Sequence, residues 1–347
     1  MEKKQIHEKA LGDIDHLEQD PLLYPSQPII DAHHHLYDRK ELRYLLPDFQ
    51  KDLKTGHNIR ATVFVQARSM YRETGPEHLR SVGETEFAVT VADQCACDTE
   101  IKTSVCDAIV GYADLQLGKR VAEVLEAHID SGKGRFRGIR HIVAWDADKS
   151  LLNPAYPTSR DMMDSAKFRA GFSELARAGL SFDAWLFFHQ LNDLVKLARA
   201  FPETSIIVNH CGGILGIGKY TNRHPEVFAQ WKKAIVELSG CDNVSMKIGG
   251  FGLELTGFSR QQDGNASSQE LARGWKPWVE TCIEAFGTSR CMFESNFPAD
   301  RAWISYDKVW NTMKWLTAGA SVDEKDDLFW RSASRLYRLQ NVIQTGI

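Results

Sequence analysis

The segment Ile29-Ile30-Asp31-Ala32-His33-His34-His35 decides between the two common ways of building an α/β protein. Its first residues are apolar and β-branched, which predicts a buried strand that ends near His33. In an open doubly wound sheet, the first strand usually continues into a glycine-rich loop that binds phosphate. Here the strand runs into three histidines instead. The segment therefore favours a closed barrel.

Strand-like and helical stretches alternate along the rest of the chain. The eight predicted strands cover 29–33, 61–66, 108–113, 136–141, 182–188, 205–209, 244–248 and 291–296. The predicted helices between and after them cover 84–95, 119–131, 165–178, 190–200, 227–239, 273–286 and 305–318. Strands that alternate with helices, and never follow one another directly, are typical of a closed parallel (β/α)8 barrel. We therefore predict an α/β fold: a single TIM barrel over 28–347 with a terminal helix over 326–339, preceded by an N-terminal extension over 1–27.

Composition excludes several classes of protein. The chain has 347 residues, with 42 basic and 46 acidic side chains and a formal net charge of −4. This balance argues against nucleic-acid binding, which requires a basic face. No apolar run approaches the roughly 18 residues needed to cross a bilayer, and the polar first residues do not resemble a secretory signal. The seven scattered cysteines fit a reducing compartment, so we expect a cytoplasmic protein with neither a nucleic acid nor a membrane as partner.

Four histidines are expected at the carboxyl ends of three strands. His33 and His35 share one side of the first strand because side chains alternate along a strand. His189 ends the fifth predicted strand and His210 ends the sixth. These strand ends meet at one mouth of a barrel, where the active sites of this fold lie. The imidazoles could bind a divalent metal or polarise a carbonyl group, whereas the alternative for the triplet is a set of surface histidines.

Five short motifs lie at these strand ends in a characteristic order. They are DAHHH (31–35), VFVQA (63–67), GIRH (138–141), VNHCGG (208–213) and FESNFP (293–298). Over about residues 28–340, the chain thereby resembles the amidohydrolase-2 family of the amidohydrolase superfamily, and especially its lactonases of sugar acids and of 2-pyrone-4,6-dicarboxylate. The resemblance implies a TIM barrel and hydrolysis, with a minority branch that uses a metal to decarboxylate aromatic acids. It also implies that His33, His35, His189 and His210 bind metal or orient the substrate.

The eighth strand departs from the family pattern. The family commonly ends this strand with an aspartate that acts as general base or metal ligand, whereas this chain has Asn296. An amide is a poor base and a poor zinc ligand, so both a zinc-dependent and a metal-independent mechanism stay open. Glu294, on the same face as Asn296, and Asp300, expected in a more exposed loop, could each replace the aspartate as general base. Either carboxylate could instead have a purely structural role and take no part in catalysis.

Cationic and aromatic side chains near the same mouth suggest what the protein binds. The residues assigned to substrate binding are Gln66, Arg140, His141, Trp145, Lys247 and Arg301. Guanidinium and ammonium groups suit a carboxylate or a developing oxyanion, although internal ion pairs are the alternative. The loops 145–161 and 249–268 are long, which is typical of functional loops.

These observations predict a hydrolase that acts on a small molecule. We expect an activated water to open a lactone, or a related acyl bond, in a polar or carboxylated substrate that is anionic. Metal-dependent decarboxylation of an aromatic acid is one alternative. A catalytically inactive barrel that binds a small molecule is another. Barrels of this class often form homodimers, so a homodimer is also left open.

Overall fold

The computed structural model describes residues 20–39, 42–98, 102–258 and 266–339. Eight parallel strands form one sheet, in which neighbouring strands also follow one another in the sequence. They are β1 (Pro28–His34), β4 (Asn58–Val65), β5 (Ser104–Gly111), β6 (Phe136–Ile139), β7 (Ser181–Ala184), β8 (Ile206–Val208), β9 (Val244–Ile248) and β10 (Cys291–Phe293). The sheet closes where the backbone N–H of Asn296 donates to His33 O, at 2.9 Å, and that of His35 donates to Phe297 O, at 2.7 Å. The predicted TIM barrel is confirmed.

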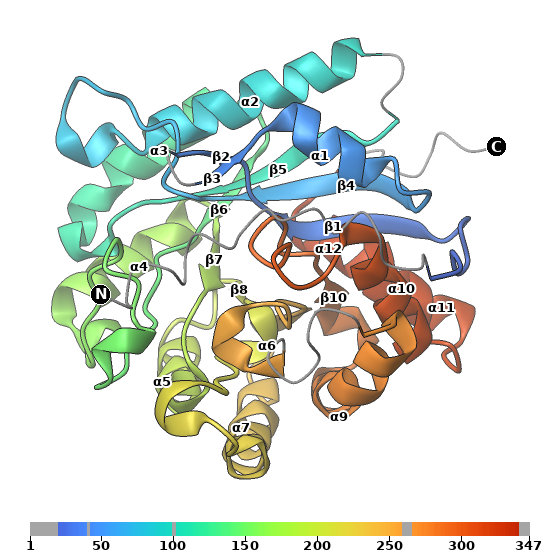
Figure 1. Ribbon diagram of the computed structural model, residues 1–347. Helices are drawn as coiled ribbons and strands as arrows, with labels where there is room; N and C mark the ends of the chain where they lie inside the picture. Colours follow the sequence, from blue (N-terminus) through green and yellow to red (C-terminus); the bar gives the residue numbers. More distant parts are fainter. Residues whose placement is uncertain (1–19, 40–41, 99–101, 259–265, 340–347) are drawn as a thin grey trace, which may run out of the picture.

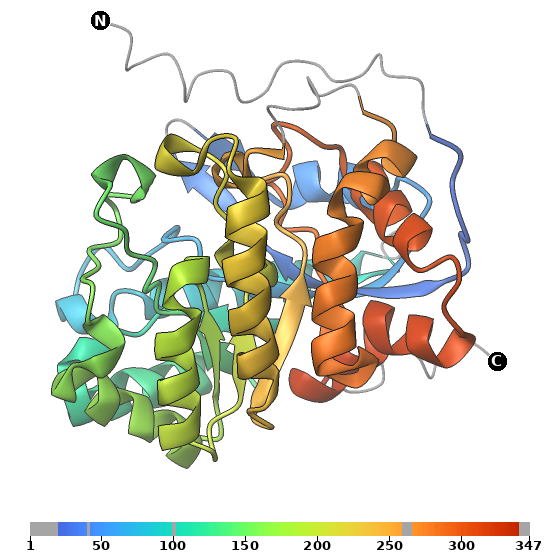
Figure 2. The ribbon, with the colours of Figure 1, turned by 90° about the horizontal axis from the view of Figure 1, so that it is seen from below.

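Most of the helices surround the strands on the outside, as Figures 1 and 2 show. The helices are α1 (Leu46–Leu53), α2 (Val82–Cys97), α3 (Val121–Ser131), α4 (Ala166–Arg177), α5 (Leu191–Ala200), α6 (His210–Gly213), α7 (His224–Ser239), α9 (Ser268–Phe286), α10 (Tyr306–Leu316), α11 (Val322–Asp326) and α12 (Ser332–Leu336). In α5, the apolar residues Leu191, Leu194 and Leu197 recur at helical spacing and are fully buried. None of the helices in the described part of the chain combines the length and hydropathy that a membrane crossing requires.

The connection between β1 and β4 differs from the prediction. It contains a short antiparallel hairpin of β2 (Tyr37–Arg39) and β3 (Leu42–Tyr44), followed by α1. The expectation that no strand directly follows another is therefore wrong here. Each of the two strands has only three residues and the hairpin carries Asp38, Arg39 and Arg43, so no alternating apolar pattern marks it.

The terminal helix predicted over 326–339 is split. One wide π-type turn, Asp327–Arg331, separates α11 from α12. This arrangement brings Tyr337 into a buried cluster with inward-facing strand residues such as Ile30 and Ala61. The carboxyl end of the chain therefore helps to fill the barrel interior.

The last part of the predicted N-terminal extension packs on α10. The backbone N–H of Leu23 donates to Asn311 Oδ1 at 3.0 Å, and Lys314 Nζ donates to the carbonyl oxygens of Leu23 and Tyr24 at 2.7 and 2.9 Å. Residues 1–19 of this extension lie outside the described residues, as do residues 259–265 of the second long loop. The boundary at residue 28 stays a prediction.

Candidate active site

Three of the four predicted histidines meet at the mouth of the barrel. His33 and His35 place their Nε2 atoms 3.2 Å apart, and the ring centroids of His33 and His210 are separated by 4.6 Å. All three side chains are buried. His210 lies two residues beyond the end of β8 and has a positive φ of 53°, which turns the chain sharply there. The structure thus brings His33 and His35 next to His210, which lies far from them in the sequence.

Glu294 joins two of these histidines. Its Oε1 accepts a hydrogen bond from the backbone N–H of His210 at 3.0 Å and lies 2.7 Å from His210 Nδ1. Its Oε2 lies 3.0 Å from His33 Nδ1, without the alignment of a hydrogen bond. An ionised carboxylate can only accept hydrogen bonds, so His210 carries its proton on Nδ1. The Nε2 atom of His210 is then left with a free lone pair.

Two buried cations flank His33. Arg140 Nη1 lies 3.2 Å from His33 Nε2, and Arg140 Nη2 donates to Gln66 O at 2.6 Å. Lys247 Nζ lies 3.4 Å from His33 Nδ1 and donates to Asp183 Oδ1 at 2.7 Å. Burial, followed by the charge of Lys247, holds the pKa of His33 well below its usual value. His33 is therefore neutral and able to accept a hydrogen bond or bind a cation.

Asn296 and Asp300 form a buried pair beside His33, His35 and His210, which we call the histidine cluster. Asn296 Nδ2 donates to Asp300 Oδ1 at 2.6 Å, and the backbone N–H of Gly252 donates to Asp300 Oδ2 at 2.9 Å. Asp300 is only 2% exposed, so the expectation of a more exposed loop carboxylate is wrong. The chain turns back at Asn296, where φ is 55°, and this turn carries Asp300 into the barrel mouth. Burial raises the pKa of Asp300 to about 8, although its two donors oppose the shift.

Three glycines after β9 allow the site to form, and sequence reasoning missed them. A Cβ atom on Gly249 would lie 2.4 Å from Glu294 Cγ, one on Gly250 would lie 2.7 Å from the His210 ring, and one on Gly252 would lie 2.7 Å from Asp300 Cβ. Each glycine therefore accommodates a different candidate residue of the site. The signal in the sequence is the run KIGGFG (247–252), where glycines directly follow a buried strand.

The chain matches known proteins over most of its length. The family model described as amidohydrolase matches residues 30–339. The chain belongs to this amidohydrolase family. It is therefore a hydrolase, and the family expected from the strand-end motifs is confirmed.

Several known proteins are similar to this amidohydrolase over nearly its whole length. The uncharacterized protein y4mH of Sinorhizobium fredii is 32% identical over 335 residues, which cover 90% of this chain and 98% of that protein. An L-fucono-1,5-lactonase of Burkholderia multivorans is 26% identical, over 89% of this chain and 96% of that enzyme. The solved structure of an amidohydrolase from Burkholderia multivorans with bound zinc has a TM-score of 0.68 at 23% identity, over 90% of this chain and 99% of that one. The resemblance to a sugar-acid lactonase, expected from the sequence, is also confirmed.

The donor atoms of His33, His210 and Glu294 are suited to a divalent metal. They all lie within 4.8 Å of one another, and two imidazoles with one carboxylate are a ligand set of catalytic zinc sites. Glu294 Oε2 is buried and accepts no hydrogen bond from the described residues, so a cation would satisfy it. His35 and His189, which were also predicted as ligands, are not part of this group, whereas Glu294 was predicted only as a base.

The other predicted site residues are divided between the cluster and its surroundings. Gln66 lies beside Arg140 and is buried, and its side-chain amide has no partner among the described residues. His141 is buried and accepts a hydrogen bond from the backbone N–H of Leu115 at 3.2 Å. The guanidinium of Arg301 packs 5.6 Å from the centroid of the Tyr44 ring.

His189 and Trp145 lie in a separate pocket. His189 Nε2 is 3.0 Å from Asp146 Oδ2, and the backbone N–H of Trp145 donates to Gln190 Oε1 at 2.9 Å. Within the described part of the chain, neither side chain forms a hydrogen bond, an ion pair or a ring contact with His33, His35 or His210. The structure thus places these two predicted residues beside the cluster, not within it.

Replacing Gly250 by alanine is expected to separate activity from stability. Gly250 has a φ of +69°, so alanine there should cost about 1 kcal/mol or more of unfolding free energy through backbone strain alone. Its Cβ would also displace the His210 ring, which should lower kcat on the order of 100-fold. Chemical denaturation and steady-state kinetics measure the two effects.

The matched control is Gly134→Ala. Gly134 has a similar φ of +79°, but no atom lies within 4 Å of where its Cβ would be. This variant should lose stability and keep its kcat. An equal loss of kcat in the two variants would contradict a role for Gly250 in positioning His210.

The buried Asp300 is expected to make stability depend on pH. Between the unfolded pKa of 3.8 and the folded pKa of about 8, the folded protein holds a proton that the unfolded chain has released. The contribution of Asp300 to the unfolding free energy therefore falls as the pH rises from about 4 to 8. Urea denaturation of the wild type and of Asp300→Asn across this range tests it, since their difference isolates Asp300. A difference that does not change with pH would show that Asp300 titrates normally.

Proposed function

We propose that this amidohydrolase opens a lactone ring in a small polar or carboxylated molecule by attack of an activated water. The observation that carries the proposal is the 2.7 Å contact between His210 Nδ1 and Glu294 Oε1. This contact fixes the imidazole so that its unprotonated Nε2 is available for chemistry at the barrel mouth. The similarity to an L-fucono-1,5-lactonase supports a lactone as the substrate class.

His210 is the proposed general base. In this scheme its Nε2 takes a proton from water as the water oxygen adds to the lactone carbonyl carbon. Glu294 keeps Nδ1 protonated and stabilises the imidazolium that forms, as a carboxylate does in a catalytic triad. When the tetrahedral intermediate collapses, the ring C–O bond breaks and the leaving alkoxide takes the proton back. The product is a hydroxy acid.

The two other carboxyl candidates fit this base role less well. Asp300, with a pKa of about 8, is mostly protonated at neutral pH and cannot accept the proton. Glu294 already accepts the two hydrogen bonds from His210. Glu294 is therefore a positioning residue in the proposed mechanism, and Asn296 holds Asp300.

Arg140 is the proposed electrophile for the developing oxyanion. Arg140 is 5% exposed and its guanidinium lies beside His33, where a charge is only weakly screened by water. A buried cation aimed at the oxygen that gains charge in the transition state lowers the barrier. His35, whose Nδ1 lies 2.8 Å from Val65 O, keeps its Nε2 toward His33 at the same place.

A divalent metal such as zinc would be held by His33, His210 and Glu294. When bound, such an ion polarises a carbonyl or lowers the pKa of a water molecule. In the metal-dependent form of the proposal, Nε2 of His210 would be a ligand of the ion, so His210 is the general base only in the metal-independent form. Both forms require a neutral His210 with an unprotonated Nε2. The residues that orient His210 therefore matter in either form.

A substrate panel combined with metal analysis tests the proposal. The purified protein is assayed with aldonolactones, with 2-pyrone-4,6-dicarboxylate and with hydroxybenzoates, while acid release and CO2 are followed and zinc is quantified by mass spectrometry. We expect at least one lactone to be opened well above its spontaneous rate. Release of CO2 from a hydroxybenzoate without lactone opening would favour a decarboxylase and overturn the proposal. Absence of both activities would favour an inactive binding barrel.

A further inference from the structure

A small pocket lies at the barrel mouth, beside the histidine cluster. Its volume is about 230 Å³, below the roughly 300 Å³ of pockets for drug-sized ligands, so it suits a small metabolite. Loops that follow β6, β7 and β8 build it, and the polar and aromatic side chains that matter here are Trp145, Asp146, Arg160, His189, Lys219 and Tyr220. We call this set of residues the rim pocket.

Two aromatic rings lie between the rim pocket and His210. The Trp185 ring centroid is 4.8 Å from that of His210 and 6.1 Å from that of Phe187. The Phe187 ring centroid is in turn 6.1 Å from that of His189. The rim pocket is therefore close to the proposed reaction centre but distinct from it.

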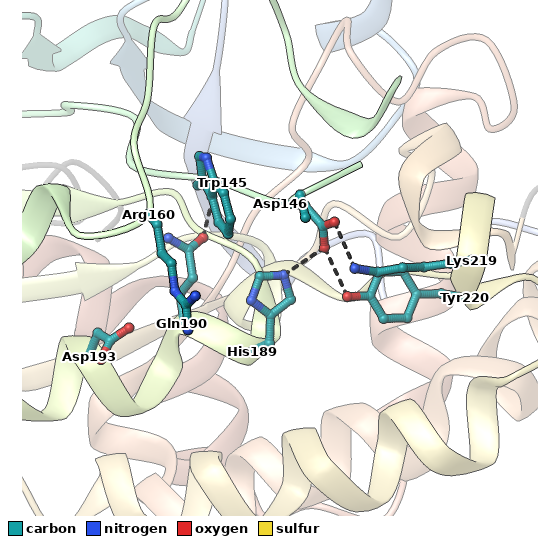
Figure 3. A pocket seen from close by; sticks show the side chains of 9 residues that line it. Trp145, Asp146, Arg160, His189, Gln190, Asp193, Lys219 and Tyr220 are labelled. Atoms are coloured by element: carbon teal, nitrogen blue, oxygen red, sulfur yellow. Dashed lines mark hydrogen bonds and ion pairs between the residues drawn. The ribbon is translucent and has the colours of Figure 1, made fainter. Parts of the chain in front are cut away.

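Asp146 fixes the protonation state of His189. His189, Lys219 and Tyr220 all converge on the Asp146 carboxylate, as Figure 3 shows. His189 Nε2, Lys219 Nζ and the Tyr220 hydroxyl lie 3.0, 2.8 and 2.9 Å from its oxygens. Burial opposes the ionisation of Asp146, but hydrogen bonds from Lys219, from the backbone of Asp148 and from Tyr220 outweigh it and hold its pKa below the usual value. The ionised carboxylate can only accept, so His189 is protonated on Nε2. Its Nδ1 is then a free acceptor.

The charges around the rim pocket leave one cation unpaired. Asp146 is neutralised by Lys219 at 2.8 Å, and Asp193 by Lys196 at 2.8 Å. Arg160 is exposed and forms no hydrogen bond or ion pair with any residue that the structure describes. The rim pocket therefore offers a guanidinium to an anion and a nitrogen lone pair to a hydroxyl group.

We propose that the rim pocket binds a hydroxycarboxylate, with its carboxylate on Arg160 and a hydroxyl group that donates to His189 Nδ1. This inference rests on the proposed function, because opening a lactone creates a carboxylate and a hydroxyl group in one molecule. The closed ring lacks that new carboxylate, so the rim pocket discriminates in favour of the product. Guanidinium and carboxylate groups form strong charge-assisted hydrogen bonds, which suits such discrimination.

Calorimetric titration of the full chain with D-gluconate and L-fuconate tests the inference. D-Glucitol, which has hydroxyl groups but no carboxylate, and acetate, which has no hydroxyl group, are the comparison ligands. We expect at least one hydroxycarboxylate to bind at least tenfold more tightly than either comparison ligand. Arg160→Gln and His189→Phe should each weaken that binding about tenfold or more, whereas Arg120→Gln, at another exposed arginine, should leave it unchanged.

The outcomes separate the rim pocket from the proposed reaction. Glu294→Gln should keep its affinity for the hydroxycarboxylate, because Glu294 does not line the rim pocket. The inference is overturned if neither hydroxycarboxylate binds, if acetate binds as tightly, or if Arg160→Gln binds like the wild type, even where lactone opening is observed. Conversely, binding that depends on Arg160 in a protein that opens no lactone would support the rim pocket and overturn only the reaction.

Discussion

Replacing His210 by asparagine is expected to lower kcat for lactone opening by about 100-fold to 10,000-fold, the range typical of a lost general base. The variant removes the Nε2 lone pair that both forms of the proposed mechanism require. Asparagine tolerates a positive φ well, so it should keep the backbone turn at 53°. It also keeps the backbone N–H that donates to Glu294 Oε1. Steady-state kinetics together with thermal unfolding measure the loss of activity and check the fold.

The control for this variant is His78→Asn. His78 is partly exposed and its Nε2 lies 3.3 Å from Glu123 Oε2 on the surface, so its replacement should change neither kcat nor the unfolding temperature. If His210→Asn retained nearly the wild-type kcat, His210 would have no part in catalysis. The assignment of the active site to the histidine cluster would then be wrong.

The barrel could be predicted from sequence because its strands carry a strong local signal. Runs such as 61–66 and 206–208 are rich in apolar, β-branched residues, and they are buried on both faces of a parallel sheet. The hairpin of β2 and β3 carries no such signal, because its strands are short and partly charged. Apolar periodicity therefore predicted the strands of the barrel but not the small additions at its mouth.

The site was harder to predict because most of its residues lie beyond the ends of the strands, where side chains no longer alternate between two faces. The phase argument for His189 required an extended strand through residue 188, but β7 ends at Ala184 and residues 188–190 form a helical turn. His189 consequently points to Asp146 in the rim pocket. His33 remains within β1, which ends at His34, and was placed correctly in the first predicted strand.

The eighth strand shows the same effect. β10 ends at Phe293, and the positive φ of Asn296 turns the chain back toward the barrel. Alternation alone could not show that Asn296 would donate to Asp300, or that Glu294 would bridge His33 and His210. The contacts of Glu294 join residues far apart in the sequence. The positions of Glu294 and Asp300 also depend on the close approach that Gly249 and Gly252 allow.

Replacing Glu294 by glutamine is the second change with a large expected effect, a fall in kcat of about 100-fold or more. The amide has nearly the shape of the carboxylate, but it carries no charge to stabilise a protonated His210. It also provides a donor where the carboxylate provided only acceptors, so Nδ1 of His210 need no longer carry the proton. Because Glu294 acts through His210 and does not bind the substrate in the proposed mechanism, KM should change much less than kcat.

A matched control for Glu294 is Glu174→Gln on α4. Glu174 is also a buried glutamate, but its partner is Arg177, 3.3 Å away on the same helix. This variant should keep its kcat. Zinc content measured on Glu294→Gln tests the metal assignment at the same time, since a protein that binds zinc through Glu294 should lose most of it. A nearly normal kcat with a normal unfolding temperature would remove Glu294 from the mechanism, and His210 would then have to be oriented without it.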